Sequence, residues 1–150
     1  LESLGWTVVA ITTSGVSVRV EARLIRLGSV LVSISMVGLI YAMPSGPIWL
    51  IALLSSIMGI GFGMSWSFVS KRIIANVSEA ERAQASASIP TFMRVSMALG
   101  SALSGIIANF SGFSEDSSVE VAQNVAFWCF AAFVPLIVVG LFTAWRVSRE

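Results

Sequence analysis

Long apolar runs dominate the chain, and short polar stretches separate them. An α-helix needs about 20 mostly apolar residues to cross the hydrocarbon core of a bilayer. Four runs meet or nearly meet this length, and a shorter run rich in Ser and Thr precedes them. We therefore expect membrane helices over residues 4–18, 24–43, 47–70, 86–110 and 121–145, of which the first is incomplete.

Turn and capping residues mark the boundaries of these runs. Pro47 suits the first turn of a helix, where the missing N–H costs nothing. Ser78 and Ser117 each begin an S-x-x-E capping box, which predicts a helix start at both positions. Pro135 falls inside the last run and predicts a kink there.

The composition supports a membrane protein. Of the 150 residues, 56% are hydrophobic and 11% are charged, whereas a soluble domain carries roughly 25% charged residues. The mean hydropathy is +0.89. So few charges do not cover a soluble surface. We predict an all-α integral membrane fold, a helical bundle with four full transmembrane helices and a truncated first one. We expect this bundle to interact with the lipid bilayer and not with nucleic acid.

The basic residues occupy alternate connections between the apolar runs. They lie at 19–26, at 71–82 and after the last run, whereas the connections at 44–46 and 111–120 contain no Lys or Arg. Cytoplasmic loops are enriched in Lys and Arg. This alternation predicts a multi-pass protein, of the bacterial inner (plasma) membrane, with its C-terminus in the cytoplasm. Arg94 is the one basic residue inside a predicted span.

Arg94 falls on the side of its helix that carries the smaller residues. At about 100° per residue, that side also holds Thr91, Ser101 and Gly105, and the opposite side holds bulkier residues such as Phe92 and Leu103, together with Ser96. Small residues suit a close neighbour or a cavity, and bulky ones suit lipid. Arg94 therefore either lines a water-filled path and meets an anionic group, or extends to the nearby headgroups or to a carbonyl.

The third run combines glycines with an aromatic residue on one helix face. Gly59 and Gly63 form the G-x-x-x-G spacing of close-packed membrane helices, and Gly100 and Gly105 suggest similar packing in the fourth run. Ser56 and Trp66 share the face of Gly59 and Gly63. Trp66 then either forms a cavity wall or serves as a packing residue or interface anchor.

Several kinds of chemistry lack candidate residues. The chain has no His and one Cys, Cys129, and no Asp or Glu lies inside a predicted span. We therefore expect no metal site, no cofactor and no enzyme activity. A proton relay, which in membrane carriers is commonly an acidic residue inside a span, would have to lie outside these residues.

Three segments resemble the major facilitator superfamily of transporters. SEAERAQASASIPTFMRVSMALGSALSGIIANFSGF, residues 78–113, is similar to the penultimate helix of its drug or metabolite exporters. GIGFGMSWSF, residues 59–68, resembles the helix before it. RVEARLIRLGSVL, residues 19–31, resembles a cytoplasmic loop but lacks the Asp of the family's G-x-x-x-D-R-x-G pattern. The resemblance implies the C-terminal portion of a two-bundle transporter.

These observations lead to one expected function and one alternative. The first is a fragment of a secondary active transporter that moves a small molecule by alternating access, as proton-coupled export. Its partners would be the small-molecule substrate and the missing N-terminal bundle of the same protein. Arg94, Trp66, Thr91, Ser101 and Ser56 would line its cavity. The alternative is a small membrane scaffold that associates with other helices through its small-residue faces.

Overall fold

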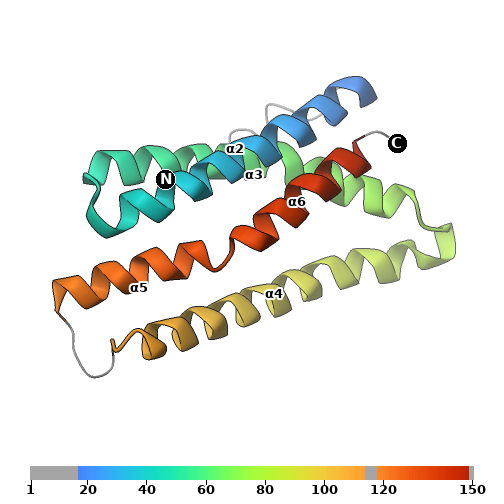
Figure 1. Cartoon of the computed structure of the whole chain (residues 1–150). Helices are drawn as coiled ribbons and strands as arrows, with labels where there is room; N and C mark the ends of the chain where they lie inside the picture. Colours follow the sequence, from blue (N-terminus) through green and yellow to red (C-terminus); the bar gives the residue numbers. More distant parts are fainter. Residues whose placement is uncertain (1–16, 114–117, 149–150) are drawn as a thin grey trace.

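The computed structural model describes residues 17–113 and 118–148 (Figure 1). The elements are α2 (Val18–Ser45), α3 (Ile48–Ala75), the 3₁₀ turn η1 (Glu79–Glu81), α4 (Arg82–Phe110), α5 (Val119–Ala131) and α6 (Val134–Val147). Within these described ranges all regular structure is helical. The prediction of an all-α fold is confirmed, and the expected run over residues 4–18 falls almost wholly outside the described residues.

Four segments are long and apolar enough to cross a membrane: Arg19–Ser45, Ile48–Ala75, Glu79–Phe110 and Val119–Val147. They correspond to the four full spans that the sequence predicts. Many of their large apolar side chains are exposed, Phe110 by 89% and Tyr41 by 71%. Exposure of such side chains along a whole span is expected where the surrounding medium is lipid.

Helices α2 and α3 form a closely packed hairpin. Pro47 precedes the first residue of α3, as its fixed φ and missing N–H favour. Gly59, Gly61 and Gly63 are buried in α3, and the packing role of Gly59 and Gly63 stays a prediction. A close approach joins Gly61 to Gly28 of α2: a methyl group built on Gly28 would lie 2.4 Å from the Gly61 carbonyl oxygen.

The last span is interrupted where the sequence predicts a kink. Helix α5 ends at Ala131 and α6 begins at Val134, with Pro135 in its first turn. A proline cannot donate the backbone hydrogen bond that would continue the preceding helix, and its ring clashes with the carbonyl four residues earlier. The kink prediction is therefore confirmed, as a break of two residues.

The two predicted capping boxes have different outcomes. The Ser78 hydroxyl donates to Glu81 Oε2 at 2.7 Å and makes no capping bond, and a 3₁₀ turn precedes α4, which begins only at Arg82. Ser78 is nevertheless the N-cap residue of the helical segment Glu79–Phe110, so the predicted start is confirmed, with a first turn of 3₁₀ geometry. Ser117 lies outside the described residues; its neighbour Ser118 caps α5 by accepting the Val121 N–H at 3.4 Å.

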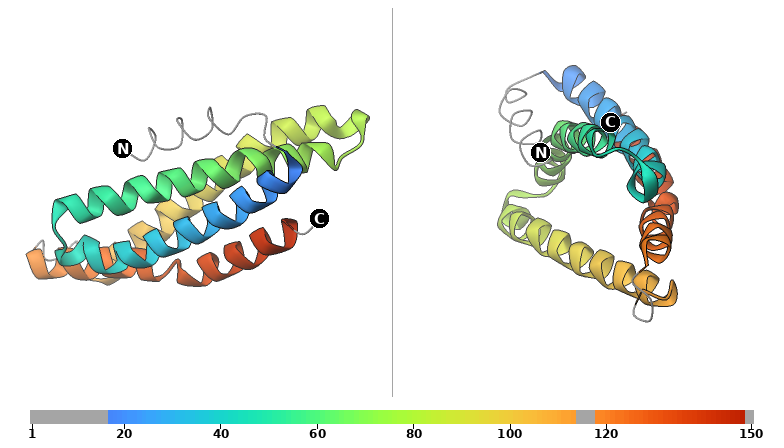
Figure 2. Two further views of the ribbon diagram at one scale, coloured as in Figure 1. Left: turned by 90° about the horizontal axis from the view of Figure 1, so that it is seen from above. Right: turned by 90° about the vertical axis from the view of Figure 1, so that its left-hand side faces the viewer.

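The helices surround α2 unevenly. Helix α2 packs against α3 on one side and against α5 and α6 on another. Helix α4 is set apart and contacts mainly α3 and α5, as the right view of Figure 2 shows. Because α4 has few contacts with the other described helices, there is space for a groove beside it.

Candidate functional site

A groove of about 710 Å³ separates α3 from α4, and we call it the α3–α4 groove. Its volume falls within the range of small-molecule sites. Three of its lining residues, Phe62, Trp66 and Ile73, come from α3, and the rest come from the first half of α4. The α4 residues are Ser88, Ile89, Phe92, Met93, Ser96 and Met97.

A second groove of about 610 Å³ lies among α2, α3 and α6, and we call it the α2–α6 groove. Helix α2 contributes Val32 and Met36 to it, and α6 contributes Ile137 and Leu141. Helix α3 contributes Phe62 and Trp66 again, together with Ser65 and Val69. The two grooves therefore lie on either side of the same pair of aromatic residues.

Phe62 and Trp66 form the shared wall. They are four residues apart on α3, so their side chains lie on one face a single turn apart. Their ring centroids are 5.7 Å apart and the rings are inclined by only 8°, which is a stacked arrangement. Stacked aromatic pairs present a broad, rigid apolar surface. This surface is suited to contact with a planar or apolar molecule in either groove.

Several hydroxyl groups in the grooves donate hydrogen bonds to carbonyl groups of their own helices. In the α2–α6 groove, Ser33 donates to the Ser29 carbonyl at 2.7 Å and Ser65 donates to the Gly61 carbonyl at 2.7 Å. In the α3–α4 groove, Ser88 donates to the Ala85 carbonyl at 2.9 Å. No Asp, Glu, Lys or Arg of the described chain lines either groove. The grooves thus offer an apolar surface whose hydroxyl groups are mainly available as acceptors.

The structure distributes the predicted site residues unevenly. Trp66 lines both grooves. Arg94, Thr91 and Ser101 are exposed on α4 and lie outside the lining of the two grooves. Ser56 also lies outside and donates to the Ala52 carbonyl at 2.7 Å. The placement of Arg94, Thr91, Ser101 and Ser56 along a substrate path stays a prediction.

Both sides of α4 that the sequence distinguishes contribute to the groove, since Met97 lies on the side of Arg94 and Phe92 lies on the side assigned to lipid. Phe92 and Ser96 both lie opposite Trp66. At Gly100 and Gly105, no described atom comes within 4 Å of a methyl group built on the backbone. Small residues allow close backbone approach, whereas here α3 and α4 are separated enough for Phe and Met side chains to fill part of the space.

Sequence reasoning missed a polar cluster at one end of the bundle, which we call the basic end. Glu21 of α2 is only 3% exposed and its Oε1 lies 2.5 Å from Lys71 Nζ of α3. Arg72 donates to the Val147 carbonyl, and Arg26 donates to the Ser148 hydroxyl at 2.6 Å.

Arginine side chains thereby satisfy carbonyl groups at the C-terminus of α6. Arg26 also donates to the Ser148 carbonyl, at 3.2 Å. The last carbonyls of a helix have no partner within the helix, and cations are favoured near them. The loop positions of Arg26 and Arg72 indicated topology in the sequence, but only the tertiary contacts reveal that they join α2 and α3 to α6.

Comparison of the chain with protein-family models, with curated proteins and with solved structures finds no match. The fold and the grooves therefore carry the functional argument.

Proposed function

We propose that this chain is the C-terminal part of a secondary active transporter that exports a small molecule by alternating access, coupled to protons. The observation that carries the proposal is the pair of grooves that share the Phe62–Trp66 wall. They lie between spanning helices, where bundle proteins commonly hold their ligands. The apolar lining favours an apolar or planar aromatic substrate over a charged one.

Two further features support the proposal. The basic residues at the starts of α2 and α4 and at the ends of α3 and α6 agree with a cytoplasmic location for this end under the positive-inside rule. In addition, α4 contacts little of the described chain and carries Arg94 on its exposed side. In the proposed assembly, the N-terminal bundle covers that side, and Arg94 meets an anionic group there.

Dye efflux from cells that express the whole protein tests the proposal. We expect efflux of an uncharged planar aromatic dye such as Nile red, with loss of most activity in Trp66→Ala and in Arg94→Ala. Trp49→Ala is the matched control, because Trp49 is 66% exposed at the start of α3 and lines neither groove. Normal efflux by well-folded Trp66→Ala and Arg94→Ala proteins would contradict the assignment of these residues.

A membrane scaffold is the second candidate function. The observation that favours it is the open space around Gly100 and Gly105 on a helix whose Leu99 and Leu103 are also exposed. Such a surface is able to receive another helix. Energy transfer between labelled copies of the chain in vesicles tests this alternative: association that Gly105→Leu abolishes would favour the scaffold, and a monomer at all protein-to-lipid ratios would contradict self-association.

A further inference from the structure

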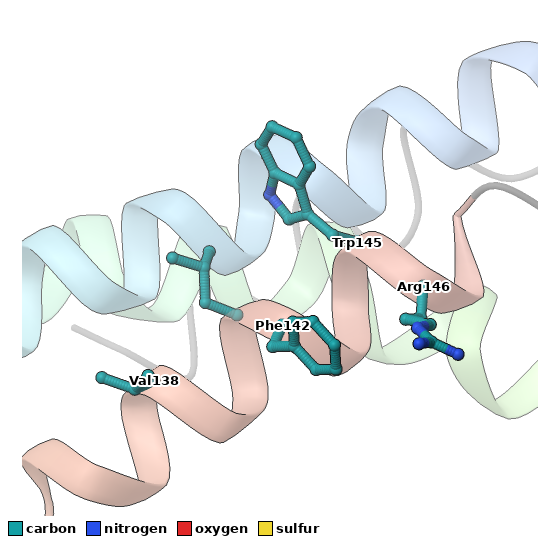
Figure 3. Close-up of a pocket in the computed structure, with 5 residues that line it drawn as sticks. Val138, Phe142, Trp145 and Arg146 are labelled. Carbon is teal, nitrogen blue, oxygen red and sulfur yellow. The ribbon is translucent and has the colours of Figure 1, made fainter.

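A trough of about 340 Å³ runs along the surface of α6 (Figure 3) and shares only Leu141 with the α2–α6 groove. Its lining residues are Val138, Leu141, Phe142, Trp145 and Arg146. Val138, Phe142 and Arg146 follow one another at intervals of four residues, and Leu141 and Trp145 do the same. The two rows form parallel ridges on the helix surface, and the trough lies between them.

The trough changes from apolar to cationic along its length. Val138 and Phe142 are 63% exposed, and they lie inside the segment that is able to span a membrane. Trp145 and Arg146 lie in the last turn of that segment. Tryptophan and arginine near the end of a span are expected at headgroup depth. The apolar part of the trough is then at the depth of acyl chains, and the guanidinium is at the depth of phosphates.

Trp145 and Arg146, at the polar end of the trough, have different contacts. The guanidinium carbon of Arg26 lies 5.7 Å from the centre of the Trp145 ring, so α2 supports one ridge of the trough. The Arg146 guanidinium carbon lies 5.4 Å from the centre of the Phe142 ring. No carboxylate of the described residues pairs with Arg146. By contrast, Lys71 pairs with Glu21, and Arg72 donates to the Val147 carbonyl.

We propose that this trough binds an anionic phospholipid. One acyl chain lies between the two ridges, and the headgroup phosphate accepts hydrogen bonds from Arg146. The planar guanidinium matches two phosphate oxygens at once, which distinguishes it from a Lys ammonium. The occupant is a lipid because the trough opens toward the medium that surrounds a spanning helix. The inference rests on the membrane fold alone and does not depend on transport.

Quenching of tryptophan fluorescence by lipids with brominated chains tests the proposal. The full protein is reconstituted in vesicles that contain brominated phosphatidylglycerol or brominated phosphatidylcholine, and the Trp145 signal is isolated by subtraction of the Trp145→Phe protein. We expect Trp145 to be quenched preferentially by phosphatidylglycerol. Arg146→Gln should lower this preference about fivefold, and Arg146→Lys should keep about half of it or more.

Arg19→Gln is the matched control, because Arg19 is an exposed arginine at the same basic end but outside the trough. An unchanged preference in Arg19→Gln together with a loss in Arg146→Gln supports a site. An equal loss in both variants shows a general surface attraction and overturns the proposal, as does equal quenching of the unmodified protein by the two lipids. Far-UV circular dichroism establishes that each variant is folded; if Arg146→Gln is not, the comparison of Arg146→Met with Arg19→Met decides in the same way.

Discussion

The contact between Gly28 and Gly61 predicts an unusual response to a glycine-to-alanine change. A methyl group on Gly61 would lie 2.7 Å from the Gly28 carbonyl oxygen and 3.0 Å from the Val32 backbone nitrogen. Both of these neighbours are backbone atoms, so they cannot move aside by side-chain rotation. The helices would have to separate along their shared surface.

The expected loss follows from two opposing terms. Overpacking of a well-packed contact costs about 1–3 kcal/mol, whereas replacement of Gly by Ala in a helix gains at most about 1 kcal/mol. Because the added methyl group would lie only 2.7 Å from a backbone oxygen, the cost is in the upper half of that range, about 2–3 kcal/mol, and Gly61→Ala should destabilise the protein by about 1–2 kcal/mol. Gly105→Ala is the matched control, since no described atom lies within 4 Å of its added methyl group. This control should be neutral or slightly stabilising.

Unfolding in mixed micelles, with increasing dodecyl sulfate and with helical circular dichroism as the signal, measures both variants. We expect Gly61→Ala to unfold at a lower detergent fraction than the unmodified protein, and Gly105→Ala at the same or a higher one. A Gly61→Ala protein as stable as Gly105→Ala would refute the close approach of α2 and α3 at this position.

Two other predictions concern the basic end and the orientation of the chain. Lys71→Met removes the cation beside the buried Glu21 carboxylate and should lower the free energy of unfolding by about 1–3 kcal/mol. The control Arg82→Met breaks an exposed ion pair and should lower it by at most about 1 kcal/mol in the same unfolding assay. Equal losses of stability in the two variants would show that burial of Glu21 is unimportant. In a cysteine-free background, a cysteine at Ser45 should react with an impermeant reagent added outside intact cells and one at Ser78 should not; the reverse pattern would invert the proposed topology.

The helical spans could be predicted from the sequence because a long apolar run has one stable form in a membrane. The predicted run over 47–70 lies within Ile48–Ala75 except for its first residue, and Pro135 marked the break between α5 and α6. The geometry of the helix ends was less predictable. Ser78 satisfies the capping-box pattern, but its hydroxyl contacts the Glu81 side chain and not a backbone N–H, a choice that sequence spacing does not determine.

The candidate site was only partly predictable because helix rotation depends on the distance between helices. The sequence separated small from bulky residues on α4 and assigned the small side to neighbours. In the structure, α3 and α4 stand apart, so the bulky Phe92 and Met93 lie opposite Trp66. A periodicity argument identifies faces, but it does not state how far away the facing helix is.

The sequence alone did not show which residues of different helices contact one another. The spacing Gly59-x-x-x-Gly63 directed attention to α3, but it did not indicate the close contact between Gly61 and Gly28. Gly28 follows a basic stretch and shows no G-x-x-x-G spacing to another glycine. Likewise, Glu21 and Lys71 are 50 residues apart, and only the α2–α3 packing brings them together.

The central claim is that the α3–α4 groove belongs to a water-filled substrate path. Thiol labelling inside this groove tests the claim most directly. Ser96→Cys places a thiol in the groove lining, and Val139→Cys, at a residue 58% exposed on α6, places one on the surface expected to face lipid. In the whole protein, without other cysteines, Ser96→Cys should react with a membrane-impermeant maleimide, and Val139→Cys should not. Failure of Ser96→Cys to react under conditions that label Ser45→Cys would contradict a substrate path and place this face of α4 against lipid or another helix.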